Sequence, residues 1–224
     1  NDEKLLELFK YWSKDQSNEE EWIKKIFKCV GSHTLTVELL AKQIRNEGIT
    51  PLEKYSQIIE NGLPNLKGMV TSEKDRHVSK EVVFRHIINL FNVSNLSEEK
   101  KMVMLAGALL PIAGVNRKVF NYIASDYSGD IVADLAESGW IRISDGVSVH
   151  PLIAEVVLAT IFESRYINTC LIRIKELFEK EENRPLSTYE ENKDMRNAIL
   201  SINENLKKAD YRSKEYCGIL MLNY

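Results

Sequence analysis

Apolar side chains recur every three or four residues through the first part of the chain. This spacing places them on one face of a helix. It occurs in three successive short segments, whose apolar positions are Leu5, Leu6, Phe9, Trp12, Trp22, Ile23, Ile26, Phe27, Val30, Leu35, Leu39, Leu40 and Ile44. The pattern predicts three short amphipathic helices that share one core.

A fourth helix is predicted from its start signal. Thr50 can cap the helix, Pro51 suits its first position, and Glu53 completes a Thr-x-x-Glu capping box. Asn61-Gly62 is a typical helix end, so we expect the helix to stop there.

A polar stretch then interrupts the helical pattern. Residues 64–77 are irregular and predict a loop or a short extended segment, and helical spacing resumes over residues 79–91. Residues 92–95 form a polar hinge. We therefore expect a helical domain over residues 1–94.

The following residues predict a winged-helix domain over residues 95–160. Ser97 caps the first of three helical patterns, and two alternating runs on either side of Asp145-Gly146 predict a β-hairpin that closes at His150-Pro151. The apolar positions of the three helices include Met102, Leu105, Leu109, Leu110, Val119, Phe120, Ile123, Ile131 and Leu135.

The remaining residues, 161–224, are expected to form a helical segment. Helical spacing continues to Phe178, the charged run before Pro185 predicts a break, and two further helices are expected over residues 195–206 and 213–222. The predicted fold class is therefore mainly α, with a helical bundle, a winged-helix domain with a small β-hairpin, and a C-terminal helical segment. That segment would be the start of tetratricopeptide-like repeats if the array continues.

Composition and net charge limit the kinds of partner that the chain is expected to bind. The chain has 224 residues, of which 44% are hydrophobic, and a formal net charge of −3, which gives no general attraction to nucleic acid or anionic membrane. Its longest apolar run, residues 102–115, is shorter than the roughly 20 residues that cross a bilayer. Three cysteines far apart in sequence predict no disulfide framework, so we expect a cytoplasmic location. The chain begins inside a helical pattern, and we expect it to be part of a longer protein.

The third helix of the predicted winged helix is acidic. Asp126, Asp130, Asp134 and Glu137 surround it, and the sequence has no Lys or Arg between positions 118 and 142. Carboxylates at the helix that usually reads DNA would repel phosphates. The sequence therefore makes a nucleic-acid partner unexpected and favours protein or intramolecular contacts.

Candidate chemistry is sparse. The sequence has neither a Gly-x-x-x-x-Gly-Lys-[Ser/Thr] loop nor a Gly-x-Gly-x-x-Gly loop, and its four histidines lack metal-ligand spacing. No catalytic constellation can be named, so we predict no catalytic or metal site and no enzyme in this chain. His150 is placed either to cap the following helix or to face an anion. His33, Thr34 and Leu35 begin another helix, whose amides favour a polar group.

Two short motifs and the order of elements carry a family resemblance. Residues 30–39 are similar to the glycine-leucine-proline-leucine motif of the STAND-class, NB-ARC-like signal-transduction NTPases, with Thr34 where the family usually has proline. Residues 149–151 fall where that family has methionine-histidine-aspartate, and His150 is the residue that matches. The start of the chain, residues 3–9, resembles the beginning of the family's small helical domain.

The resemblance implies a nucleotide-switched signalling ATPase. In such a protein ADP or ATP is held by a P-loop domain, which is missing here, so this fragment alone is not expected to bind nucleotide tightly. His150 would contact the β-phosphate of ADP, and His33, Thr34 and Leu35 would lie in the motif that closes over adenine. The implied partners are the intramolecular P-loop domain, C-terminal sensor repeats, and further copies of the protein on activation.

Two other functions remain open. A winged-helix transcriptional regulator would bind duplex DNA in a salt-dependent way. A helical adaptor would act without any dependence on ATP or ADP.

Overall fold

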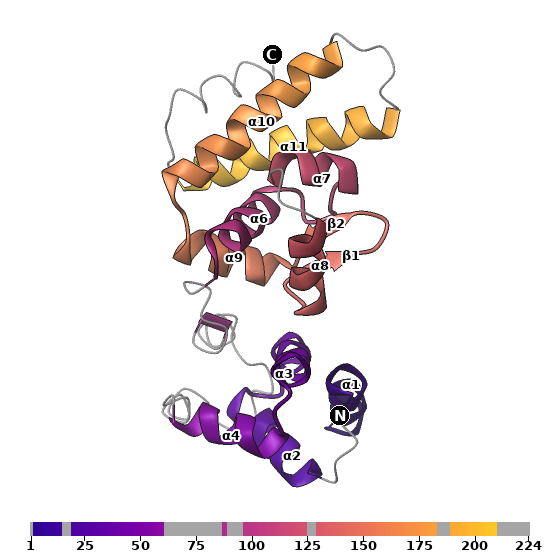
Figure 1. Ribbon diagram of the computed structural model, residues 1–224, viewed down its shortest axis with the longest axis vertical. Helices are drawn as coiled ribbons and strands as arrows, with labels where there is room; N and C mark the ends of the chain where they lie inside the picture. Colours follow the sequence, from indigo (N-terminus) through magenta and orange to yellow (C-terminus); the bar gives the residue numbers. More distant parts are fainter. Residues whose placement is uncertain are drawn as a thin grey trace. The chain divides into compact units, whose positions relative to one another are not determined.

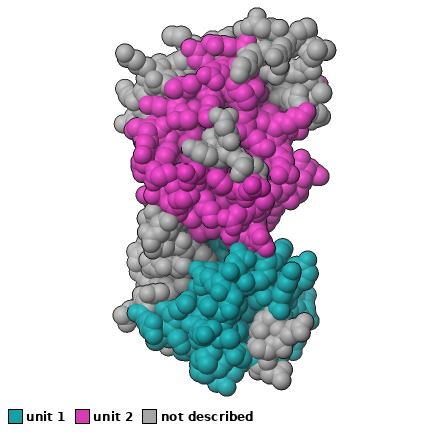
Figure 2. All heavy atoms as spheres, in the orientation of Figure 1, with its two compact units in different colours: residues 1–92 teal, residues 93–224 magenta. Residues whose placement is uncertain are grey.

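The computed structural model describes residues 2–14, 19–60, 87–88, 96–124, 129–182 and 189–209. These residues are mainly helical, with one small antiparallel sheet (Figure 1). This confirms the predicted fold class. The chain divides into two compact units, Asn1–Asn92 and Val93–Tyr224, which are called unit 1 and unit 2 below (Figure 2).

Unit 1 contains the three helices that the apolar spacing predicts and the fourth that its start signal predicts. They are α1 (Asp2–Ser13), α2 (Glu20–Cys29), α3 (Thr34–Glu47) and α4 (Pro51–Glu60). Helix α1 packs on α3 and α2 packs on α4, and the rings of Phe9 and Phe27 meet edge to face with centroids 5.8 Å apart. Their shared core consists of Phe9, Ile23, Ile26, Phe27, Val30, Val37, Leu40, Ala41, Ile44 and Ile58.

The start of α4 follows the predicted capping box. The backbone N–H of Glu53 donates to Thr50 Oγ1 over 3.2 Å, and the Thr50 N–H donates to Glu53 Oε2 over 2.7 Å. The predicted end at Asn61-Gly62, the loop over residues 64–77 and most of the helix over residues 79–91 lie outside the described residues. Within that last helix, Ile87 and Ile88 are described and helical.

The first part of unit 2 has the element order of a winged helix. Helices α6 (Glu98–Leu109), α7 (Arg117–Ala124) and α8 (Gly129–Glu137) precede the hairpin of β1 (Ile141–Ile143) and β2 (Val147–Val149). The two strands are antiparallel, with Ile141 opposite Val149 and Ile143 opposite Val147.

A further bridge widens this hairpin beyond the sequence prediction. Val115, between α6 and α7, pairs with Val147 through backbone hydrogen bonds of 3.1 and 2.8 Å. Gly114 turns the chain into this bridge at φ +87°, and a Cβ there would lie 2.9 Å from the Val147 carbonyl oxygen. Gly146 approaches Val115 as closely, so both glycines permit the bridge.

The remaining helices of unit 2 are α9 (Pro151–Thr160), α10 (Ser164–Glu182) and α11 (Tyr189–Lys208). Helix α9 packs on α6, and α10 and α11 pack on both α6 and α7. The segment after residue 160 therefore shares a compact unit with the winged-helix elements. Its buried side chains include Ile167, Leu171, Ile174, Ala198, Ile199, Ile202 and Leu206.

Two helix boundaries in this segment differ from the sequence prediction. Helix α10 continues past Phe178 to Glu182, because Glu and Lys are good helix formers and a charged run need not end a helix. Helix α11 begins at Tyr189, earlier than the predicted start at Met195. The predicted break at Pro185 and the helix over residues 213–222 lie outside the described residues.

Polar contacts also attach α11 to the winged-helix elements. Asp194 Oδ2 accepts a 2.7 Å hydrogen bond from the Asn116 backbone N–H, and Asn116 Oδ1 accepts from the Lys118 N–H at the start of α7. Ser201 and Asn205 donate to the Leu109 carbonyl at the end of α6. Helix α11 therefore satisfies backbone groups at the ends of two other helices.

Candidate functional site

His150 is the N-cap of α9. It follows the buried end of β2 with φ −61° and ψ 136°, and its Nδ1 accepts a 3.2 Å hydrogen bond from the Leu152 N–H. Pro151 occupies the first helical position. Since Nδ1 is the acceptor, the neutral ring carries its proton on Nε2, which is then a donor. The His150 side chain is exposed. The hydrogen bond that it accepts from the Leu152 N–H is the capping contact that was predicted for it.

His33, Thr34 and Leu35 lie together at the start of α3 in unit 1. His33 is the N-cap, with φ −74° and ψ 120°, and its carbonyl accepts from the Val37 N–H. Thr34 is exposed and Leu35 is half-buried. Within the described residues, the His33 side chain makes no hydrogen bond to the first turn of α3.

A tight turn delivers the chain to α3. Gly31 and Ser32 both adopt left-handed backbone conformations, with φ +64° and +56°. The Ser32 N–H donates to the Phe27 carbonyl over 2.8 Å and so satisfies an end group of α2. A non-glycine residue in this conformation carries backbone strain of about 1 kcal/mol or more, and such strain is often found at functional turns.

The two candidate helix starts share a charge pattern. The first turns of α3 and α9 contain no acidic residue, and those of α7 and α10 contain none either, whereas α1, α2, α4, α6 and α8 each begin with at least one. The positive end of the helix dipole is therefore not offset by a carboxylate in the first turn of α3 or α9. Such ends favour an anion. His33 and His150 belong to different units.

The outer face of α8 is acidic. Asp130, Asp134 and Glu137 are exposed, whereas Val132 and Leu135 are buried against the rest of unit 2. Asp134 pairs with Lys100 of α6. A helix with this surface disfavours phosphate backbones when it is offered to a DNA groove.

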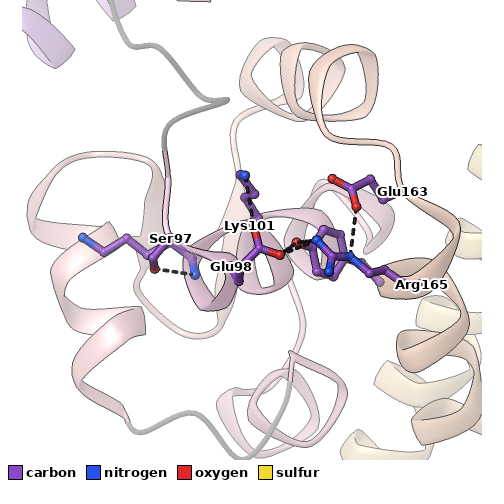
Figure 3. Close-up of polar contacts among 7 residues, drawn as sticks. Ser97, Glu98, Lys101, Glu163 and Arg165 are labelled. Atoms are coloured by element: carbon purple, nitrogen blue, oxygen red, sulfur yellow. Dashed lines mark hydrogen bonds and ion pairs between the residues drawn. The ribbon is translucent and has the colours of Figure 1, made fainter.

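A polar cluster joins the first turns of α6 and α10 (Figure 3). The Glu98 carboxylate accepts hydrogen bonds from Arg165 and from the Tyr166 hydroxyl, and it also pairs with Lys101 over 3.2 Å. Arg165 Nε donates to Glu163 over 2.9 Å. Glu98 lies in the first turn of α6, where a carboxylate is favourable to the helix dipole, but nothing local in the sequence indicates partners more than 60 residues away.

The ionisation of this cluster favours a structural role. Hydrogen bonds from Tyr166 and Lys101 lower the pKa of Glu98 below its usual value. Burial and the hydrogen bond to Glu98 raise the pKa of Tyr166 to about 12. At neutral pH the Glu98 carboxylate is charged and the Tyr166 phenol is neutral, and their hydrogen bond holds α10 against α6.

A groove of about 770 Å³ runs along unit 2 between α9 and α11, over the C-terminal end of α6. We call it the α9–α11 groove. Its lining includes the apolar residues Ala108, Leu110, Ile112, Ala154, Leu158 and Leu200. The charged residues along it are Glu155, Glu204 and Lys208. Sequence reasoning missed this groove because it depends on α11 packing beside a helix about 90 residues earlier.

Other chemistry is limited in the described part of the chain. There, no three His, Cys, Asp or Glu side chains lie together as a metal site requires. The described helices also include none that is long and apolar enough to span a bilayer. Cys170 is fully buried, and burial raises its pKa to about 12, so it is a packing residue and a poor nucleophile.

Comparisons with known proteins identify no family for this chain. The sequence matches no protein-family model, no curated protein and no solved structure. The resemblance to STAND-class NTPases therefore rests on its motifs and on the order of its elements, and it remains a prediction.

Proposed function

We propose that this chain is the regulatory part of a nucleotide-switched signalling ATPase. A P-loop domain elsewhere in the same protein would bind ADP or ATP, and this chain would close over the nucleotide. The observation that carries the proposal is the geometry of His150, an exposed N-cap at a helix start without a first-turn carboxylate. His33, Thr34 and Leu35 are the corresponding residues on unit 1.

The proposed contact follows from the protonation of the imidazole. With Nδ1 held by the Leu152 N–H, the Nε2–H is the donor that a phosphate oxygen would accept from. The dipole of α9 adds to this attraction. ADP would stabilise the closed arrangement to the extent that it contacts unit 2 there and loses those contacts when unit 2 moves away.

The division of the chain supports such a switch. The chain divides into two compact units, and nucleotide switches commonly act by moving compact units as rigid bodies. The signal would pass from the nucleotide through α9 to α6, against which α9 packs, and on to α10 and α11. Those helices would lead to the sensor repeats of the parent protein.

A nucleotide-independent helical adaptor is the second candidate function. It is supported by the α9–α11 groove, which offers a binding surface without any nucleotide. A winged-helix transcriptional regulator is the third candidate, and the acidic outer face of α8 disfavours it. Salt-dependent binding to mixed-sequence duplex DNA would restore that alternative.

Two substitutions at His150 separate nucleotide contact from capping. His150→Ala removes the cap and the imidazole, whereas His150→Asn keeps a capping oxygen and replaces the Nε2 donor with an amide that is too short to reach the same position. Both variants are made in the protein extended upstream to include the P-loop domain, and the release of fluorescent ADP is timed. We expect both to release ADP about tenfold faster, which equals about 1.4 kcal/mol.

Stability provides the control for that experiment. His150→Ala should cost about 1 kcal/mol of unfolding free energy through the lost cap, and His150→Asn should restore most of it. If His150→Asn released ADP at the wild-type rate, the side chain would be a cap and the nucleotide contact would be wrong.

A further inference from the structure

We propose that the α9–α11 groove binds an amphipathic helix of a partner protein, one with basic residues on both sides of its apolar stripe. This site lies in unit 2 alone and does not depend on the nucleotide switch. Its shape, its exposed apolar side chains and its charges each support the same occupant.

The groove has the shape of a site where one further helix could pack. Helices α9 and α11 each pack on α6 and form the two walls, and the C-terminal end of α6 forms the floor. Ala108 lines that floor and Ala154 lines one wall, so the backbone of a bound helix can approach closely. Packed helices are separated by about 8–10 Å, a distance that small residues at the contact allow.

The exposed apolar side chains favour a large partner over a small molecule. Ile112 follows α6 and is 68% exposed, and Leu200 on α11 is 54% exposed, although both line the groove. A pocket for a small ligand encloses most of that ligand, and its large apolar lining residues are correspondingly covered. An open groove with two such side chains suits the apolar stripe of a helix, with anchors three and four residues apart.

The charged residues along the groove indicate which side chains the bound helix has on either side of its apolar stripe. Glu155 stands on the α9 wall and Glu204 on the α11 wall, and Lys208 is the one cation among the described lining residues. Lys or Arg on both sides of the apolar stripe would meet a carboxylate on each wall, whereas an acidic helix would face like charges. The occupant is therefore a basic amphipathic helix.

The test uses two synthetic peptides of about 18 residues, or five helical turns. Both carry Leu at helical spacing, and one has Lys where the other has Glu. Binding to the chain is measured by fluorescence anisotropy. We expect the Lys peptide to bind at least tenfold more tightly than the Glu peptide at an ionic strength of about 0.1 M. The difference should shrink at about 1 M, where the Debye length falls from about 10 Å to about 3 Å.

Four variants locate the binding. Ile112→Lys and Leu200→Lys change exposed residues of the groove and should each weaken the Lys peptide at least tenfold. Ile172→Lys is the matched control, since Ile172 is a 46% exposed aliphatic side chain on α10 that does not line the groove. Glu155→Gln combined with Glu204→Gln should reduce the preference for Lys over Glu.

Three results would overturn the proposal. The first is the absence of Lys-peptide binding to a folded wild-type chain. The second is equal affinity for the two peptides, or a loss of Lys-peptide affinity in the Ile172→Lys control as large as in the two groove variants. The third is a concentration-dependent dimer in analytical ultracentrifugation that Leu200→Lys dissociates, because the groove would then belong to a second copy of this chain.

Discussion

Substitution of Gly114 by alanine tests whether the bridge between Val115 and Val147 holds the winged-helix elements together. Gly114 has φ +87°, and an added Cβ would lie 2.9 Å from the backbone oxygen of Val147 and 3.2 Å from Ser148 Cβ. The nearest atom is backbone and cannot rotate away, so the two segments must separate.

The expected cost has two parts. A left-handed alanine costs about 1–2 kcal/mol. Separation of the segments weakens the two hydrogen bonds of the bridge, each worth about 0.5–1.5 kcal/mol. Gly114→Ala should therefore lower the unfolding free energy of unit 2 by about 2–4 kcal/mol. Gly48→Ala is the matched control, because Gly48 caps α3 at φ +64° with nothing described within 4 Å.

Urea unfolding followed by circular dichroism measures both variants, and hydrogen exchange assigns each transition to its unit. With an m value of about 2 kcal/mol/M, the Gly114→Ala midpoint should fall by about 1–2 M. The Gly48→Ala midpoint should fall by about 0.5–1 M, from its conformational cost alone. Equal shifts in the two variants would refute the argument from close approach.

Four further predictions concern side chains of unit 2. Tyr166 has a folded-state pKa raised to about 12. Its contribution to the unfolding free energy should be full below the unfolded-state pKa of about 10 and lost as pH rises from about 10 to 12. The same loss of stability over this pH range in Tyr166→Phe would contradict this. Glu98 has a lowered pKa in the folded state, so its contribution is present at neutral pH and lost on acidification; Glu98→Gln should flatten that acid limb in a pH series of urea midpoints. Asp194→Ala leaves the Asn116 N–H without its carboxylate and should cost about 1–3 kcal/mol in urea unfolding, with a cost below about 0.5 kcal/mol as the contrary result. Cys170 should react with a thiol reagent at neutral pH far more slowly in the native chain than in denaturant, and equal rates would show that the thiol is accessible.

The sequence predicted the features that local chemistry determines. Apolar spacing predicted the first three helices of unit 1 and their shared core, since a period of 3.6 residues is visible within a single segment. The capping box at Thr50 and the hairpin at Asp145-Gly146 followed from residue preferences at single turns. His150 was predicted either as a helix cap or as an anion contact, and the structure bears out the cap.

Long-range packing accounts for what the sequence did not predict. The bridge of Val115 to Val147 carries no local signal because each partner contributes one residue. The contact of Glu98 with Tyr166 and the α9–α11 groove depend on how α10 and α11 dock onto α6. Apolar periodicity shows which face of each of these helices is buried, but it does not show which partner covers that face.

The nucleotide content of the intact protein tests the proposed function most directly. The gene product is expressed with roughly 200 further residues upstream, about one domain, then purified and denatured, and the released nucleotide is quantified. The proposal predicts about one ADP per chain. A well-folded preparation without nucleotide would contradict the switch and favour a helical adaptor that works through the α9–α11 groove.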